Sequence, residues 1–341
     1  MLGVPFSLKG SLYKPGQLRT EKGLRSPLAP PSQEGVKPNH FKVAEDILLH
    51  YFHSGEGKPV LVIHGGPGFP PTKPWDGLES LINDYQFIYY HQRGCGHSTR
   101  PIDTFETQNF MQNVKVLDEV LGLSAQLADI ERIRRILGHE KLILIGHSYG
   151  GFLACLYAVE FPEHVEKMIL IAPAGVLKFP IEEGERFDKI KDYLSEKQKA
   201  EFDNFLSRYF DYGKIFTKSE KDLSILNSEY MKHFGAAMDS QGLELPDQEM
   251  EDLALGAGWM VHALYLSLGM KYDLRDELKK VSVPVLVLHG EKDMMPVKAS
   301  HEYADLLPEG KIQMIPEATH FPFVEKPEEF ARIVREFLTM K

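Results

Sequence analysis

The sequence predicts an α/β fold built on a mostly parallel, doubly wound sheet. Short runs of continuous apolar, β-branched and aromatic residues recur along the chain, as expected of parallel strands covered on both faces. Longer helical patterns lie between these runs, and alternation of the two predicts a doubly wound sheet. The expected strands are residues 60–65, 87–92, 142–147, 167–173 and 283–290.

The expected helices define the domain organisation. Helical patterns occupy 113–137 and 149–161, and the last runs from 326 to 340 with a proline early in it. Residues 176–275 are helical and charged, without a clear core strand, which indicates a helical cap inserted before the strand at 283–290. We expect this cap, 176–275, to cover the carboxyl edge of a core formed by 41–175 and 276–341, where open α/β sheets bind ligands.

The first forty residues differ in composition from the rest of the chain. They carry six Lys or Arg against two Glu and are rich in Pro, Gly and Ser, notably in 26–38. They lack the apolar core of a secretory signal. The sequence favours a disordered or loosely docked extension over residues 1–40, with an organelle transit peptide as the alternative.

Composition limits the class of partner. A net charge of −10 argues against nucleic acid or an anionic membrane surface, and no apolar run is long enough to span a bilayer. The only cysteines, Cys95 and Cys155, argue against a disulfide framework and favour a reducing compartment, so a cytoplasmic location is expected. A small molecule or a short peptide is the expected substrate.

Residues 146–150, Gly-His-Ser-Tyr-Gly, follow an apolar strand and precede a helix. This context fits the G-x-S-x-G nucleophile elbow, in which a serine on a strained strand-to-helix turn exposes its hydroxyl. The two glycines remove side chains that would clash at so sharp a bend. Ser148 is therefore the candidate nucleophile, and a plain glycine-rich turn is the alternative.

A nucleophilic serine needs a base and a group that orients the base. Asp293 follows the late strand at 283–290, and His320 lies before the final helix. The chain order Ser148, Asp293, His320 is the one expected of this architecture. Glu291 is the second choice for the acid.

The oxyanion hole requires two backbone N–H groups. The first comes from Tyr149, directly after the nucleophile. The second comes from the loop "HGGPG" at 64–68, where paired glycines permit close backbone approach, and Gly66 is our choice.

The sequence resembles the proline iminopeptidase family of α/β-hydrolases. The resemblance rests on "HGGPG" at 64–68, "HQRGCGHS" at 91–98, "GHSYGG" at 146–151, "GEKD" at 290–293 and His320, and covers roughly residues 42–340. It implies an α/β-hydrolase fold and a serine enzyme that removes an N-terminal residue, often proline, or cleaves related small amides and esters.

Substrate-binding residues are less apparent. Where a branch of the family places a glutamate after the catalytic aspartate, this chain has Met294, and His91 replaces the family's usual acid before Gln-Arg-Gly. A tryptophan-rich cap motif is represented only by 256–265, which contains Trp259 but no acid. We expect Trp259 and Met294 near the substrate. The remaining candidate anchors for an ammonium group are Glu182, Glu183 and Glu185.

Several functional alternatives remain open. A carboxylesterase or lactonase of the same fold is the alternative to an aminopeptidase, and a non-catalytic ligand sensor is the alternative of another class. No cofactor is expected, and no spacing typical of metal ligands occurs among the fourteen histidines. Cys95 and Arg93 are expected to have structural roles, and 259–265 to form either core or pocket wall.

Overall fold

A mixed eight-stranded sheet forms the centre of the computed structural model, which describes residues 10–180, 188–245 and 255–340. Its spatial order is β1-β2-β4-β3-β5-β6-β9-β10. Strand β2 is antiparallel to both of its neighbours, β1 and β4, and the pairs from β4 to β10 are parallel. The strands are β1 (His40–Ala44), β2 (Ile47–Ser54), β3 (Lys58–Ile63), β4 (Tyr85–Tyr90), β5 (Leu142–His147), β6 (Val165–Ile171), β9 (Val285–Gly290) and β10 (Gly310–Ile315). A separate antiparallel pair joins β7 (Lys178–Phe179) to β8 (Tyr272–Asp273).

The predicted fold class is confirmed, and the five expected strands appear as β3, β4, β5, β6 and β9. The single helix expected over 113–137 is wrong, because the chain forms α1 (Phe110–Leu121) and α2 (Leu123–Leu137) instead. The break falls at Gly122, where a Cβ would lie 2.5 Å from the Ser267 hydroxyl oxygen. The two helices therefore separate where another helix approaches closely.

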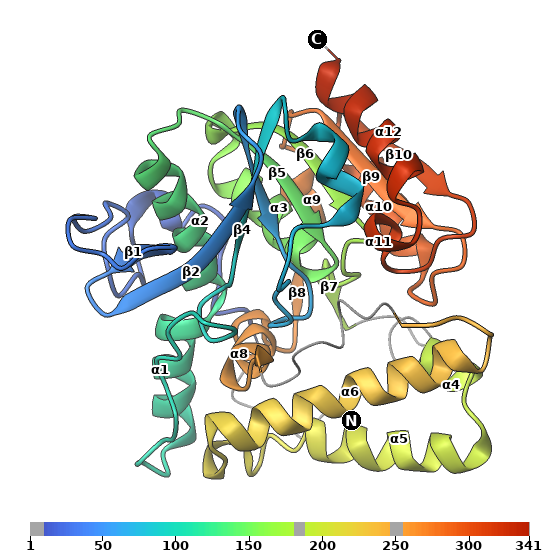
Figure 1. Ribbon diagram of the computed structural model, residues 1–341. Coiled ribbons are helices and arrows are strands. Elements are labelled where there is room, and N and C mark those ends of the chain that lie inside the picture. The colour runs from blue at the N-terminus through green and yellow to red at the C-terminus, as the bar shows by residue number, and fades with distance from the viewer. Residues whose placement is uncertain (1–9, 181–187, 246–254, 341) are drawn as a thin grey trace.

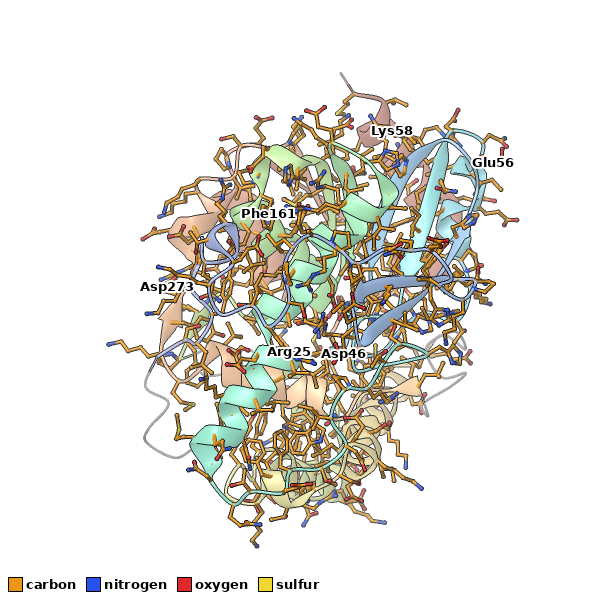
Figure 2. All side chains as sticks on the ribbon, turned by 90° about the vertical axis from the view of Figure 1, so that its left-hand side faces the viewer. Arg25, Asp46, Glu56, Lys58, Phe161 and Asp273 are labelled. Atoms are coloured by element: carbon orange, nitrogen blue, oxygen red, sulfur yellow. The ribbon has the colours of Figure 1, made fainter. Side chains whose placement is uncertain are left out.

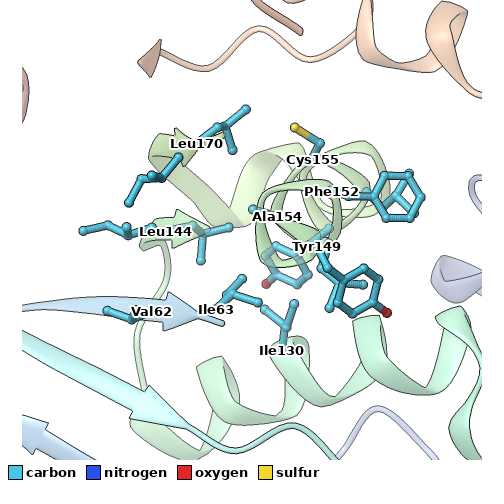
Figure 3. Close-up of a cluster of buried hydrophobic side chains, with 14 of the residues drawn as sticks. Val62, Ile63, Ile130, Leu144, Tyr149, Phe152, Ala154, Cys155 and Leu170 are labelled. Carbon is cyan, nitrogen blue, oxygen red and sulfur yellow. The ribbon is translucent and has the colours of Figure 1, made fainter. Parts of the chain in front are cut away.

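Helices cover both faces of the sheet, and α3 (Tyr149–Glu160) packs on β3, β5 and β6. Figure 3 shows Phe152, Ala154 and Cys155 of α3 among side chains such as Leu144 and Leu170 of the neighbouring strands. The other core helices are α9 (Arg275–Leu278), α10 (Val297–Leu306), α11 (Pro322–Glu325) and α12 (Pro327–Thr339). The 3-10 helices are η1 (Leu18–Thr20), η2 (Asp76–Leu81), η3 (Pro162–His164) and η4 (Ile215–Thr217).

A helical insertion separates β6 from β9, as the sequence predicts. It contains α4 (Asp188–Asp192), α5 (Glu196–Tyr209), α6 (Glu220–Asp239) and α8 (Trp259–Leu268). Ser195 and Ser219 begin α5 and α6 with reciprocal capping boxes, which satisfy backbone N–H groups at the helix starts. In Figure 1, α4, α5 and α6 form a layer below the sheet, and α8 lies between that layer and the core.

Residues 10–39 do not form the disordered or loosely docked extension that their composition suggests. Tyr13, Leu18 and Leu28 are buried against the core. Arg132 of α2 donates to the carbonyls of Ser26 and Pro27 at 2.6 and 2.9 Å. Composition misses this docking because a few buried apolar side chains and backbone hydrogen bonds can hold an irregular segment that is otherwise polar.

Candidate active site

The serine expected at the nucleophile elbow has the strained backbone that this turn requires. Ser148 follows β5 directly and adopts φ 51° and ψ −116°, a conformation that costs free energy for a residue with a side chain. A Cβ at Gly146 would lie 2.4 Å from the carbonyl oxygen of Gly150, and a Cβ at Gly150 would lie 2.0 Å from that of Ile63. Both glycines are therefore required by close backbone approach.

Backbone hydrogen bonds fix the turn on both sides of Ser148. The Ser148 N–H donates to Ile171 O of β6 at 2.8 Å, and the Ser148 carbonyl accepts from Ala174 N at 3.0 Å. Helix α3 begins at Tyr149, so its first N–H groups, which have no intrahelical partners, lie beside the serine. The Tyr149 side chain is buried in the core, which leaves its backbone amide for the site.

The acid and the histidine predicted from chain order meet after β9 and β10. His320 Nδ1 lies 2.7 Å from Asp293 Oδ2, so the ring donates to the carboxylate. The other oxygen, Asp293 Oδ1, accepts from Met295 N at 2.8 Å, and the carboxylate is fully buried. Glu291, the alternative acid, is exposed.

Two further histidines, neither expected from the sequence, contact this pair. His147 Nε2 donates to the carbonyl of His320 at 2.9 Å, which ties the elbow to the loop that carries His320. His289 Nε2 lies 3.7 Å from Asp293 Oδ2, and its Nδ1 lies 2.8 Å from Ser300 Oγ. Burial lowers the pKa of both rings, so both are neutral at pH 7. The sequence could have indicated these contacts through position, because His147 directly precedes Ser148 and His289 lies at the end of the strand that leads to Asp293.

The glycine-rich loop after β3 approaches the elbow closely. A Cβ at Gly65 would lie 3.1 Å from Ser148 Cβ, and Gly66, with φ +114°, lines the same cavity as Ser148. His64 fixes the loop: its Nδ1 donates to Gly65 O at 2.9 Å, and its Nε2 accepts from Gln92 N at 3.2 Å. Burial lowers the His64 pKa to about 4, so this neutral pattern persists at pH 7.

A cavity of about 160 Å³ connects these groups with the helical insertion. Ser148, His320 and Gly66 line it on the sheet side. Its aromatic lining residues are Phe69, Trp75, Tyr209, Tyr230, Phe234, Tyr265 and Phe321. Among the described residues that line it, none is Asp, Glu, Lys or Arg.

Residues 58–327 match the family model described as the alpha/beta hydrolase fold. The chain belongs to the α/β-hydrolase fold family. Among curated relatives, it is 26% identical over 289 residues to a proline iminopeptidase of Heyndrickxia coagulans, which covers 84% of this chain and 92% of the relative. It is 22% identical to a proline iminopeptidase of Saccharolobus solfataricus, with 84% and 87% covered. The resemblance stated above is thus supported at the level of distant relatives.

Solved structures show the same fold at lower identity. A bromoperoxidase from Bacillus anthracis superposes with a TM-score of 0.61 at 21% identity, covering 86% of this hydrolase and 96% of that chain. A proline iminopeptidase from Mycobacterium smegmatis gives 0.60 at 21%, with 86% and 95% covered. An esterase from Exiguobacterium antarcticum gives 0.58 at 20%, with 86% and 96% covered.

The two residues expected near the substrate are both buried outside the described lining of the cavity. Trp259 is fully buried, stacks on Phe216, and donates from Nε1 to Asp103 O at 2.8 Å. Met294 is also buried, and neither residue lines the described part of the cavity. Helix α8 contributes Val261 and Tyr265 to the cavity lining instead.

The cavity wall formed by α6 was missed from the sequence. Asn227, Tyr230, Met231 and Phe234 line the cavity, and their spacing of three and four residues places them on one helix face. Phe234 contacts His320, with ring centroids 6.2 Å apart. The periodicity was visible in the sequence, but it does not distinguish a cavity wall from ordinary core packing.

Side chains of the loop after β4 form hydrogen bonds that stabilise the fold. Arg93 is buried and donates to both carboxylate oxygens of Asp129, and to Val120 O at 2.9 Å. Burial raises the pKa of the Cys95 thiol to about 12, and the thiol lies 3.2 Å from Gln92 O. His91 bridges Pro71 O and His97 N through its two ring nitrogens. The predicted structural roles of Arg93 and Cys95 fit these contacts.

Within residues 10–180, 188–245 and 255–340, no three His, Cys, Asp or Glu side chains are grouped to hold a metal ion. No helix there is long and apolar enough to cross a membrane. The candidate anchors Glu182, Glu183 and Glu185 lie outside the described residues.

Proposed function

We propose that this α/β-hydrolase is a serine hydrolase that cleaves a small amide or ester through an acyl-enzyme, with Ser148 as nucleophile, His320 as base and Asp293 as the residue that orients the base. The observation that carries the proposal is the 2.7 Å hydrogen bond from His320 Nδ1 to Asp293 Oδ2 at a cavity that Ser148 also lines. This bond leaves His320 Nε2 free of a proton, as a general base requires.

The proposed reaction has two stages. His320 Nε2 takes the hydroxyl proton as Ser148 Oγ attacks the substrate carbonyl, and the protonated ring then transfers the proton to the leaving amine or alcohol. Water, deprotonated by His320, releases the acyl group in the second stage. The N–H groups of Gly66 and Tyr149 are the proposed oxyanion donors, and removal of one such donor lowers kcat about a hundred- to a thousandfold.

Release of N-terminal proline or another N-terminal amino acid is the first candidate for the substrate class. Its support is the name proline iminopeptidase carried by curated relatives at 22–26% identity over more than four-fifths of this chain. A cytoplasmic location is part of the proposal. Both cysteines are buried free thiols, as is usual for proteins of a reducing compartment.

A carboxylesterase or lactonase is the second candidate, and the cavity lining favours it. An aminopeptidase must bind a free ammonium group, for which carboxylates are the strong partners. The described lining offers aromatic rings, histidines and Asn227, but no acid. A neutral acyl group therefore suits this part of the cavity better than an ammonium group.

Labelling with a fluorophosphonate probe tests the proposed chemistry directly. We expect the wild-type protein to be labelled and Ser148→Ala to remain unlabelled, because the probe reacts only with an activated serine. An unlabelled wild-type protein, under conditions that label other serine hydrolases, would favour a non-catalytic ligand sensor.

A substrate panel then separates the two substrate classes. Prolyl and alanyl nitroanilides are compared with their N-acetylated forms and with short-chain nitrophenyl esters. Preference for the free amine supports the aminopeptidase. Equal or faster turnover of blocked amides and esters supports the esterase and rejects the aminopeptidase.

A further inference from the structure

Residues 11–19, here called the N-terminal strap, hold the end of α8. The N–H groups of Leu12 and Tyr13 donate to Ser267 O at 2.8 and 3.3 Å, and the Ser11 hydroxyl donates to the same oxygen at 3.0 Å. Ser267 lies in the last turn of α8, where helix carbonyls have no intrahelical partner. The strap therefore supplies the donors that this helix end lacks.

The same strap also holds the end of α3. Glu160, the last residue of that helix, is completely buried, and its carboxylate accepts from Tyr13 Oη at 2.7 Å and Gly16 N at 2.8 Å. Leu18 N adds a third contact at 3.3 Å, and Arg19 Nε donates to the Glu160 carbonyl at 2.5 Å. A buried carboxylate needs such partners, because burial of an unpaired charge is strongly unfavourable. Tyr13 thus contacts both helix ends.

The two helices joined by the strap form opposite parts of the candidate active site. Helix α3 begins immediately after Ser148, whereas α8 supplies Val261 and Tyr265 to the cavity wall. The other end of α8 is held by Glu220 of α6, whose carboxylate accepts from Gly258 N at 2.9 Å and Trp259 N at 2.7 Å. One end of α8 is therefore held from within the helical insertion and the other by the strap.

A second contact holds the strap-bound end of α8 to the core. The Ser267 hydroxyl bonds to Asp118 of α1 and accepts from Leu123 N of α2 at 3.2 Å. This contact fixes α8 against α1 and α2, and the strap joins the same end of α8 to the end of α3. Figure 2 looks onto the face that the N-terminal segment crosses, where Phe161, the neighbour of Glu160, is labelled above Arg25.

We propose that the N-terminal strap is a specificity-determining element, because it sets the position of α8 relative to α3 and thereby the width of the cavity at Val261 and Tyr265. The family model begins at residue 58, so the strap lies outside the matched region. Its kinetic consequence rests on the proposed serine hydrolase function, whereas its effect on α8 does not.

Two changes to the full chain test the strap, each with a control. Deletion of residues 1–19 removes it, and deletion of residues 1–9 is the control for length. Tyr13→Phe removes only the hydroxyl bonded to Glu160, and the control is Arg25→Ala, which removes the exposed ion pair with Asp46. The milder Tyr13→Phe keeps the test valid if the deletion prevents folding.

Hydrogen exchange is the first readout and does not depend on activity. Exchange at residues 259–268 is expected to become at least about tenfold faster in the deletion, and to change in the same direction but less in Tyr13→Phe. Exchange in β5 and β9 should stay unchanged, as should α8 in both controls. Unchanged exchange of α8 in the test variants, or an equal increase after deletion of residues 1–9, would overturn the proposal.

Acyl-chain selectivity is the second readout. The ratio of kcat/KM for 4-nitrophenyl butanoate to that for the acetate is expected to change at least about threefold in Tyr13→Phe, because a few CH₂ contacts decide such ratios. Fluorophosphonate labelling of Ser148 should persist. An unchanged ratio with a lower melting temperature would show that the strap only stabilises the fold, and would overturn the proposal. Absence of labelling in the wild type would instead reject the hydrolase function.

Discussion

The two sides of the cavity are built in different ways. On the sheet side, backbone approaches backbone so closely that Gly146 and Gly150 have no room for a Cβ, and Ser148 has a strained φ. On the side of the helical insertion, α6 and α8 contribute side chains such as Tyr230, Phe234 and Val261 from regular helix faces. Many side chains fit a helix face, whereas few backbones form the turn at Ser148.

This difference indicates which side determines which property. The chemistry of the proposed reaction depends on atoms fixed within tenths of an ångström, and the sheet side provides them through strand ends and backbone hydrogen bonds. Substrate choice depends on cavity shape, which changes with single side chains of the insertion. We therefore expect changes on the sheet side to abolish activity, and changes on the insertion side to redirect it.

The largest expected effect tests the backbone approach at the elbow. Gly150→Ala would place a Cβ 2.0 Å from Ile63 O, so β3 and α3 must separate. We expect the variant to unfold or to lose fluorophosphonate labelling completely. Circular dichroism of the same sample shows whether the protein is still folded. Gly235→Ala on α6 is the matched control, because a Cβ there meets nothing within 4 Å. This substitution should stabilise the protein by about 0.5 to 1 kcal/mol, since alanine favours a helix more than glycine does. Equal tolerance of both changes would contradict the comparison.

The second prediction compares a buried ion pair of the core with an exposed one of the insertion. Glu131 is buried, and although burial alone would raise its pKa, hydrogen bonds from Arg134, Arg135 and Tyr157 lower it to about 2. A carboxyl group with a lowered folded-state pKa stabilises above its unfolded value near 4.5, and loses this contribution as the pH falls toward 2. We expect Glu131→Gln to lower the free energy of unfolding by up to about 3 kcal/mol at pH 7.

Urea unfolding at several pH values measures this effect. The difference between wild type and Glu131→Gln should shrink between about pH 4.5 and 2. Glu229→Gln, which breaks the exposed pair with Arg208, is the control and should cost less than about 1 kcal/mol. A pH-independent loss for Glu131→Gln would show that packing rather than charge is responsible.

The sequence predicts the sheet side of the site well and the insertion side poorly, for a physical reason. The elbow, Asp293 and His320 follow strand ends in a fixed chain order, and a backbone constraint appears in sequence as an obligatory glycine. The sequence could not show that Trp259 and Met294 are buried away from the described cavity lining, because an apolar residue on a helix or after a strand looks the same whether it faces core or cavity. The docked strap was missed because its contacts join distant residues, as between Tyr13 and Glu160.

The third prediction concerns the bond that joins the elbow to the His320 loop. His147→Leu removes the donor to His320 O and should lower kcat at least about tenfold, because a small displacement of the base impairs proton transfer. His147→Gln retains a side-chain N–H and should recover most of the rate. If both variants lose the same activity at equal melting temperature, the hydrogen bond does not position His320.

The smallest expected effect lies on the insertion side. Val261→Ala enlarges the cavity by two methyl groups without touching Ser148, His320 or Asp293. We expect the kcat/KM ratio of butanoate to acetate nitrophenyl esters to rise about threefold to tenfold, with labelling retained. Loss of labelling in this variant would show that the two sides of the cavity are not separable.

The two buried cysteines make this protein a convenient subject for spectroscopy. Cys95 and Cys155 are the only cysteines in the chain, both are free and buried, and burial raises the pKa of both thiols. Thiolate is the reactive species, so maleimides and methanethiosulfonates should leave both untouched in the folded state. A single cysteine introduced at exposed Ile225 on α6 would then carry a spin label or fluorophore as the sole reporter, with the native thiols left in place.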